Sequence, residues 1–166
     1  MANFYRAYWD ACAWIALINQ EPTHHNTLRD IYEKAFCGEL EIWTSTFTYA
    51  EVFKRNCGGS LPVGTSSMDD QKTIEMDKIL DQDFIKRVNV DLMIGDGARK
   101  LLRKYPALNK PQDAIHVMTA LYHNLDVMHT FDRADLLSFN NILDRRDGKK
   151  LRIEIPKYDK PLLEKL

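Results

Sequence analysis

Four acidic residues stand at places along the chain where a metal-dependent active site could form. Asp10 directly follows one apolar stretch, and Asp132 follows another late in the chain. Glu51 and Asp113 lie in segments whose apolar spacing predicts helices. Carboxylates that converge in one cleft repel each other, and a bound Mg²⁺ or Mn²⁺ relieves this repulsion because hard cations prefer oxygen ligands. Such a centre would hydrolyse phosphodiester bonds with a metal-activated water, so no nucleophilic serine, cysteine or histidine is needed.

Each of these acids also has an ordinary structural explanation. Asp10 could cap a helix, although a lone buried aspartate between apolar neighbours is costly. Glu51 could be a solvated helix position, and Asp113 could be a first-turn acid favoured by the helix dipole. Asp132 could be a turn residue, and we expect Asp135, three positions on, to cap the turn that follows. The set of four is therefore stronger evidence than any one member.

The elements that would position these acids alternate between strands and helices. Strands are predicted over residues 4–9, 40–44, 84–90, 125–130 and 151–155. Helices are predicted over residues 11–19, 26–38, 45–53, 68–82, 91–104 and 111–124, with a short helical turn over 134–139. This alternation indicates an α/β fold, with three layers (α/β/α), a central mainly parallel sheet and a single domain over residues 1–166.

Particular residues indicate where the helices begin and end. Asn26 and Asp91 are expected N-caps, and Pro111 fits the first turn of a helix. Gly38 and Asn124 are expected to end the helices that precede them. The helix after the second strand is expected to turn four side chains inward: Tyr49, Ala50, Val52 and Phe53.

The segment over residues 56–67 interrupts this alternation. It contains three glycines, a proline and a cluster of serine and threonine, so we expect a loop. A polar helix is expected to follow it. We interpret residues 56–82 as an insertion in the domain that could contact substrate or a partner.

The composition limits the class of protein. The formal net charge is −1, so any nucleic-acid surface must be local. Cys12, Cys37 and Cys57 have no zinc-type spacing and fit a reducing compartment. The sequence contains no apolar run of the roughly 20 residues that a membrane helix needs, and its first residues do not resemble a signal peptide. We therefore expect a cytoplasmic protein.

Four sequence blocks resemble the PIN-domain ribonuclease family and, within it, the VapC-type toxins of bacterial toxin–antitoxin systems. The third block is the most telling, and the order and spacing of all four carry the resemblance. They are Tyr8-Trp-Asp10-Ala-Cys-Ala-Trp-Ile-Ala-Leu, Trp43-Thr-Ser-Thr-Phe-Thr-Tyr-Ala-Glu51-Val, Lys110-Pro-Gln-Asp113-Ala-Ile-His-Val-Met-Thr-Ala and Met128-His-Thr-Phe-Asp132-Arg-Ala-Asp-Leu.

The resemblance implies an endoribonuclease that cleaves single-stranded or structured RNA with Mg²⁺ or Mn²⁺, a homodimer, and often a neutralising antitoxin protein that docks near the site. It implies that Ser45 and Thr130 are supporting hydroxyls. Cys12 stands where the family often has serine or threonine, and a thiol is a weaker hydrogen-bond partner. The 56–82 segment is also longer than in compact toxins of this kind. By position, the resemblance implies catalytic and metal-binding roles for Asp10, Glu51, Asp113 and Asp132.

Further residues near these acids could contact RNA. His116 lies one helical turn beyond Asp113, although a packed or surface histidine is the more common outcome. We interpret the basic run over residues 145–150 as a hairpin turn rather than an RNA-binding patch. Four cations could grip phosphates, with a solvated surface position as the equal alternative: Lys54, Arg55, Lys110 and Arg133.

Three other functions compete with a toxin. An RNA-processing nuclease that is not a toxin would have the same acids but no antitoxin. A non-catalytic PIN-type module that binds RNA or protein typically lacks one or more of the acids, and all four are present here. A haloacid-dehalogenase-like enzyme needs Asp-x-Asp after the first strand, whereas Asp10 is followed by Ala11 and Cys12.

Overall fold

The computed structural model describes residues 5–52 and 70–157, without the side chains of residues 70–73. Its centre is a five-stranded sheet with the order β3-β2-β1-β4-β5, in which every pair of neighbours is parallel. The prediction of a mainly parallel sheet is therefore confirmed. The strands are shorter than most of the predicted segments: β1 Tyr5–Trp9, β2 Leu40–Ser45, β3 Lys86–Val88, β4 Val127–His129 and β5 Arg152–Glu154.

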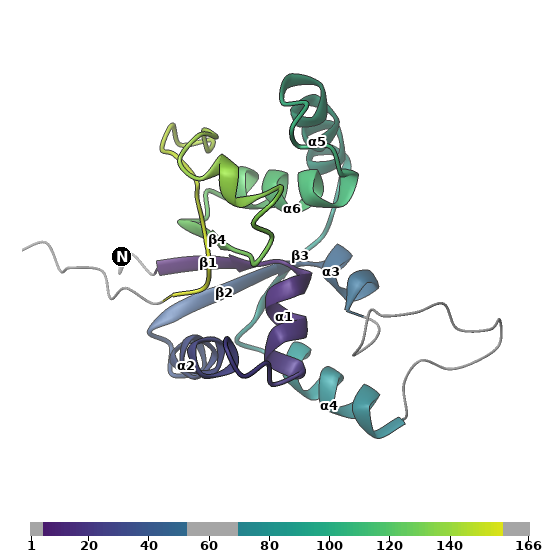
Figure 1. The fold of residues 1–166 in the computed structure, drawn as a ribbon, viewed down its shortest axis with the longest axis vertical. Coiled ribbons are helices and arrows are strands. Elements are labelled where there is room, and N and C mark those ends of the chain that lie inside the picture. Colours follow the sequence, from purple (N-terminus) through teal and green to yellow (C-terminus); the bar gives the residue numbers. More distant parts are fainter. Residues whose placement is uncertain (1–4, 53–69, 158–166) are drawn as a thin grey trace, which may run out of the picture.

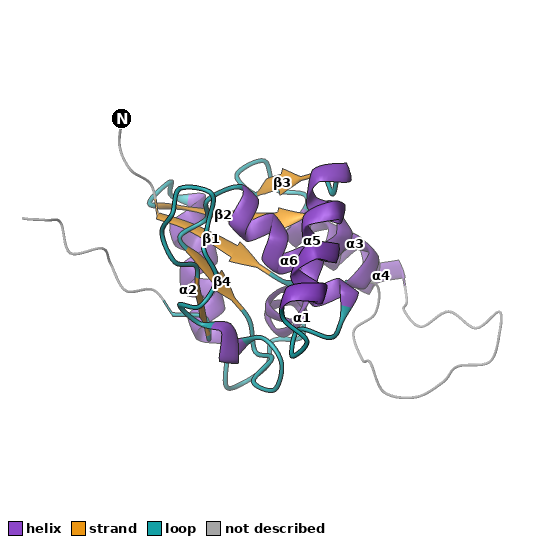
Figure 2. Ribbon diagram, turned by 90° about the horizontal axis from the view of Figure 1, so that it is seen from above, coloured by secondary structure: helices purple, strands orange, loops and turns teal. Residues whose placement is uncertain are grey.

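Helices cover both faces of this sheet, which confirms the three-layer α/β/α architecture. In Figure 1, α1, α2 and α4 lie below the sheet, and α5 and α6 lie above it. Figure 2 shows α5 and α6 side by side over the strands. The helices are α1 Ala11–Ile18, α2 His25–Phe36, α3 Thr46–Glu51, α4 Asp70–Leu80, α5 Leu92–Lys104 and α6 Pro111–Tyr122, with a 3₁₀ turn, η1, at Leu137–Phe139.

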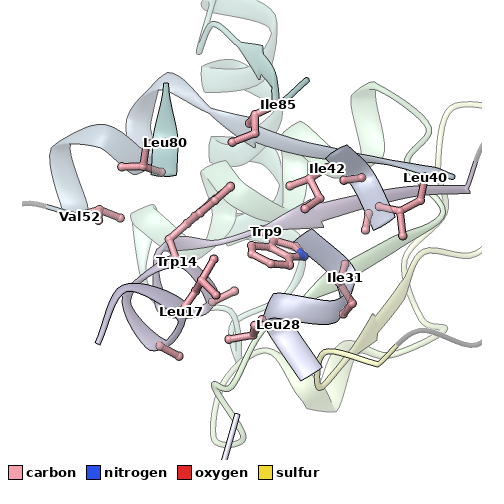
Figure 3. Packing of buried hydrophobic residues seen from close by; sticks show 14 of the residues in the cluster. Trp9, Trp14, Leu17, Leu28, Ile31, Leu40, Ile42, Val52, Leu80 and Ile85 are labelled. Carbon is pink, nitrogen blue, oxygen red and sulfur yellow. The ribbon is translucent and has the colours of Figure 1, made fainter. Parts of the chain in front are cut away.

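The sheet separates two apolar cores because successive strand side chains point to opposite faces. Trp9 of β1 packs in the core between the sheet and helices α1 and α2. Its neighbour Tyr8 packs in the core on the opposite face, between the sheet and helices α5 and α6. Figure 3 shows the first core, where Trp9 and Trp14 lie between the sheet and the helices. Their ring centroids are 4.8 Å apart in an edge-to-face arrangement. This packing anchors the last residue of β1 against α1, directly beside Asp10.

Most of the expected helix signals are confirmed. The Asp91 side chain accepts a hydrogen bond from the Ile94 backbone N–H at 3.0 Å. Pro111 occupies the first turn of α6, and Gly38 and Asn124 adopt positive φ angles of 75° and 54° after their helices.

Two expectations about helices are wrong. Asn26 is not an N-cap, because α2 begins one residue earlier at His25 and the capping position, His24, makes no side-chain cap bond. Ala50 is exposed rather than inward-facing, because α3 is only six residues long and packs one narrow face against the core. Val52 is buried as expected, and Phe53 lies outside the described residues.

The expected loop over residues 56–67 also lies outside the described residues. The helix expected after it is present as α4. That residues 56–82 form an insertion stays a prediction. Among the described residues, no helix has the length and apolar character needed to cross a membrane.

Candidate active site

A cavity of about 340 Å³ lies at the carboxyl end of the sheet, where β1, β2 and β4 all stop. Parallel strands bring their carboxyl ends to one edge, so residues that are distant in sequence meet there. All four acids predicted from the sequence line this cavity. Its lining includes Asp10, Cys12, Glu51, Asp113, His116 and Asp132.

Asp10 is held by the beginning of α1. It is the N-cap residue, and its Oδ1 accepts a hydrogen bond from the Ala13 backbone N–H at 3.1 Å. The residue is only 5% exposed. Burial raises the pKa of this carboxyl group, opposed by nearby His116 and by hydrogen bonds from Cys12, Thr130 and the Ala13 backbone. A buried carboxylate at a cavity wall is suited to a cation.

Cys12 supports Asp10 in the place where the family often has a hydroxyl. Its Sγ donates to Asp10 Oδ1 at 2.8 Å and lies 3.4 Å from Thr130 Oγ1. The same sulfur accepts from the Phe131 backbone N–H at 3.3 Å. Burial raises the pKa of the thiol, which therefore keeps its proton as a donor. The thiol thus occupies a supporting position, despite the weaker hydrogen bonds expected of sulfur.

Asp113, Asp132 and Asp135 form an acidic cluster in the part of the chain that the structure describes. Each offers an oxygen, and the three oxygens all lie within 4.8 Å of one another. Asp113 Oδ2 is buried without a hydrogen-bond partner among the described residues. Burial raises the pKa of Asp113 to about 6, and nearby Asp132 and Asp135 act in the same direction while Lys110 opposes them. An unpaired buried oxygen beside like charges is the environment that a cation would relieve.

The roles of Asp132 and Asp135 are the reverse of those expected within their turn. Asp132 Oδ1 accepts from the Ala134 and Asp135 backbone N–H groups at 3.1 and 2.9 Å, so Asp132 caps the turn. The expectation that Asp135 caps it is wrong. An aspartate side chain bonds the backbone two or three residues ahead, and Asp132 begins this turn. Asp135 instead pairs with Lys110 Nζ at 2.5 Å, and Asp132 lies 3.6 Å from the same amine.

Glu51 enters the cavity from the end of α3 and contacts a histidine. His116 Nε2 lies 2.6 Å from Glu51 Oε2. His116 is 3% exposed, so the expectation of a packed histidine is confirmed. What the sequence reasoning missed is that this packed side chain also touches one of the acids. The available signal was its three-residue spacing from Asp113, which places both on one face of α6.

The two predicted supporting hydroxyls lie behind the acids. Thr130 Oγ1 accepts from the Asp132 backbone N–H at 3.1 Å. Ser45 is buried at the end of β2, 3.4 Å from the Thr48 hydroxyl. Thr130 therefore contacts both Cys12, which supports Asp10, and the backbone of Asp132. Ser45 contacts Thr48 rather than one of the acids.

Comparison with known proteins places this arrangement in a family. The sequence profile of the PIN domain matches residues 7–142, most of the chain. The chain belongs to the PIN-domain family. Its sheet flanked by helices on both faces is the fold expected of that family. A search of curated protein sequences finds no significant match.

Solved structures with a similar fold include three toxin or toxin–antitoxin proteins. The toxin VapC20 of Mycobacterium tuberculosis, described as cleaving the sarcin–ricin loop, aligns with a TM-score of 0.56 at 15% identity over 76% of this chain and 89% of its own. The VapBC2 complex of Rickettsia felis, bound to a fragment of promoter DNA, aligns at 0.57 with 14% identity, covering 89% and 98%. A toxin–antitoxin complex of Klebsiella pneumoniae aligns at 0.52 with 20% identity, covering 78% and 88%.

The donor set of this PIN-domain cavity suits a hard divalent cation. The groups that face one another are carboxylate oxygens, and the Asp113 Oδ2 atom has no other partner among the described residues. Both ring nitrogens of His116 already have partners, and the Cys12 thiol is engaged with Asp10. Oxygen ligands without free nitrogen or sulfur favour Mg²⁺ or Mn²⁺ over zinc.

The predicted phosphate-binding cations have different environments. Lys110 is paired with the acidic cluster, and Arg133 is exposed next to Asp132. Lys54 and Arg55 lie outside the described residues. Of these two described cations, Arg133 is therefore the better candidate for a phosphate contact, because it is exposed and Lys110 is paired with Asp135.

Proposed function

We propose that this PIN-domain protein is a Mg²⁺- or Mn²⁺-dependent endoribonuclease that hydrolyses phosphodiester bonds of RNA, and that it is the toxin of a toxin–antitoxin pair. One observation carries the proposal. Carboxylates from four separate parts of the chain line one cavity at the carboxyl end of the sheet. Carboxylates with a purely structural role are normally hydrogen-bonded or exposed to water, because a buried polar atom without a partner is unfavourable. The Oδ2 atom of Asp113 is nevertheless buried and unpaired among the described residues.

Each acid has a distinct part in this proposal. Asp113 and Asp132, whose oxygens lie close together, would hold the cation from α6 and the turn after β4. Asp10 and Glu51 would complete the site from the ends of β1 and α3. When bound, a divalent cation supplies an activated water and neutralises charge on the phosphate. Cys12 and Thr130 keep Asp10 and the Asp132 turn in place. Arg133, exposed beside Asp132, would attract the RNA backbone.

The toxin assignment rests on the similar solved structures, two of which are toxin–antitoxin complexes. We propose a homodimer and a small antitoxin protein as partners. Coexpression with the product of a small reading frame next to the gene tests the second partner. A copurifying protein that inhibits RNA cleavage supports the toxin assignment, and an active nuclease whose gene lacks such a neighbour supports an RNA-processing role.

Cleavage of labelled single-stranded RNA tests the enzyme assignment. We expect cutting by the purified protein with Mg²⁺ or Mn²⁺, loss of cutting in EDTA, and recovery when Mn²⁺ is returned in excess. The Glu51→Gln variant should lose most of this activity because an amide is a poor cation ligand. Glu39→Gln, at an exposed position just before β2, is the matched control and should cut like the wild type.

The outcomes of this assay separate the alternatives. Cutting that persists in EDTA contradicts metal dependence. If the protein neither cuts RNA nor binds Mn²⁺ in calorimetry, it is a non-catalytic binding module. Binding of Mn²⁺ without cutting points to a structured RNA substrate, which a panel of folded RNAs then identifies.

The affinity for Mn²⁺ should depend on pH through Asp113. Because the pKa of this group in the metal-free protein is about 6, protons compete with the cation below that pH. We expect the Kd measured by calorimetry to change little above pH 7 and to weaken about 10-fold between pH 7 and pH 5, as one proton must leave for each cation bound. A Kd that stays constant from pH 7 to pH 5 contradicts a role for Asp113 as a ligand.

A further inference from the structure

A buried tyrosine and a buried histidine form a chain of hydrogen bonds that ends on Glu51. The Tyr8 hydroxyl lies 2.7 Å from His116 Nδ1, and His116 Nε2 lies 2.6 Å from Glu51 Oε2. Tyr8 is 0% exposed and His116 is 3% exposed. The three residues come from β1, α6 and α3, so the chain crosses three elements.

The direction of each hydrogen bond follows from the carboxylate. An ionised Glu51 can only accept, so His116 Nε2 must carry a proton and donate it. In a neutral ring the other nitrogen, Nδ1, is then an acceptor, and the Tyr8 hydroxyl must donate to it. Burial raises the pKa of Tyr8, so the hydroxyl keeps the proton that it donates. The nearby Ser45 and Thr48 hydroxyls oppose this rise in the pKa of the phenol without reversing it.

Glu51 needs such support because its own helix offers little. The α3 helix has six residues and ends at Glu51 itself. By contrast, α6 has twelve residues and carries Asp113 and His116 on one face, three positions apart. A hydrogen bond from His116 to Glu51 therefore sets the position of one acid relative to another, and leaves the second oxygen of Glu51 open to the cavity.

We propose that Tyr8 and His116 are positioning residues that hold the Glu51 carboxylate toward the metal site: His116 donates from Nε2 to Glu51, and Tyr8 anchors the imidazole ring by donating to Nδ1. The inference rests on the proposed function only for its consequence, metal binding. The tautomer itself is a property of the metal-free protein. Metal ligands are commonly oriented by such outer hydrogen bonds, and removing one weakens metal binding about 10- to 100-fold.

The tautomer can be measured directly in the metal-free protein by long-range ¹H–¹⁵N NMR of the histidine rings. In the wild type we expect His116 to be protonated on Nε2 alone. In Tyr8→Phe, which keeps the ring but removes the donor, we expect Nε2 to keep its proton and the Nδ1 signal to shift, because Nδ1 loses its hydrogen bond. Tyr122→Phe, near the far end of α6, is the matched control and should leave the His116 signals unchanged.

The consequence for metal binding is tested by two substitutions at residue 116. A glutamine amide can reach the place of Nε2 and donate to Glu51, whereas an asparagine amide reaches only the place of Nδ1. We expect Mn²⁺ affinity in calorimetry to weaken about 10-fold or more in His116→Asn and to be largely retained in His116→Gln. Circular dichroism melting of both variants shows whether each is folded, so a folding defect is not mistaken for lost positioning.

The results separate this inference from the proposed function. A wild-type ring protonated on Nδ1, or on both nitrogens at neutral pH, overturns the assigned hydrogen bonds whether or not RNA is cut. Equal Mn²⁺ affinity in folded His116→Asn and His116→Gln overturns the positioning role. If the wild type binds no Mn²⁺, the proposed function and its consequence here both fail, and the Nδ1 signals of the wild type and Tyr8→Phe still decide whether Tyr8 anchors the ring.

Discussion

We expect Asp113→Asn to remove RNA cleavage while making the metal-free protein more stable. The amide keeps the size of the side chain but is a poor ligand for a divalent cation. Loss of a residue that merely supports a metal ligand costs about 10- to 100-fold, so we expect kcat/KM to fall by more than about 100-fold. The measurement is single-turnover cleavage of labelled RNA in Mn²⁺, with Asp83→Asn at an exposed position between α4 and β3 as the matched control.

The gain in stability follows from the pKa of Asp113. Its value in the folded protein, about 6, is above the ordinary 3.8, so the folded state holds a proton more tightly than the unfolded chain does. The fold is therefore destabilised by this group at neutral pH, and the destabilisation is relieved as pH falls through about 6 toward 4. Because the side chain is half-buried, solvent reduces the effect, and we expect Asp113→Asn to gain about 1 kcal/mol at pH 7.

Thermal melting of both proteins without metal, at pH 4 and pH 7, measures this difference. The variant should melt higher at pH 7, and the gap should close at pH 4, where the wild-type carboxyl group is protonated. A variant that has lost activity and is also less stable at pH 7 would indicate that Asp113 is a structural residue. Full activity in the variant would contradict the whole site assignment.

Arg145→Ala should cause a large loss of stability at a distance from the active site. Arg145 is 6% exposed, and its guanidinium donates two bonds to the Asp147 carboxylate at 3.1 and 2.7 Å. It also donates to the Leu125 carbonyl and to Asp126, at 2.8 and 3.0 Å. These bonds fasten the 145–148 turn to the chain entering β4. Removing one member of a fully buried ion pair costs about 3 kcal/mol or more, because the remaining charge has no partner. The Asp126 and Asp147 side chains are 31% and 32% exposed, so solvent reduces this cost and we expect a loss of about 2 kcal/mol.

Thermal denaturation followed by circular dichroism measures this loss. We expect the Tm of Arg145→Ala to fall by about 6 °C, the shift that corresponds to about 2 kcal/mol in a chain of this size. The adjacent Arg146 is exposed and lies over the Tyr122 ring at 4.4 Å, so Arg146→Ala is the matched control. Its effect should stay below about 1 kcal/mol. Equal Tm values for the two variants would contradict the structural role of Arg145.

The sequence predicted the fold well because the fold depends on local patterns. Short apolar segments alternate with helical periodicity, and a parallel sheet needs a helical crossover between consecutive strands. Asp91 and Pro111 cap and begin their helices as expected. The expectation for Asn26 was wrong because capping preference alone does not locate the first turn: Thr23 is also a suitable cap, and α2 begins at His25.

The sequence was less informative inside the candidate site. It identified the four acids, and parallel strands that end at one edge brought all four to one cavity. It assigned the turn cap to Asp135, whereas the backbone after β4 places Asp132 at the beginning of the turn and leaves Asp135 to Lys110. The choice between two aspartates three residues apart depends on the exit angle of the strand, which no local pattern contains.

The sequence by itself therefore determined the order of the elements, the carboxylates at strand ends and the resemblance to PIN domains. Only the tertiary structure decided which side chains meet across that order. Tyr8 and His116 are 108 positions apart, and His116 and Glu51 are 65 apart, yet they share one chain of hydrogen bonds. Helix and strand periodicity describe neighbours within about one turn, whereas contacts between elements depend on how the sheet and its two helical layers pack.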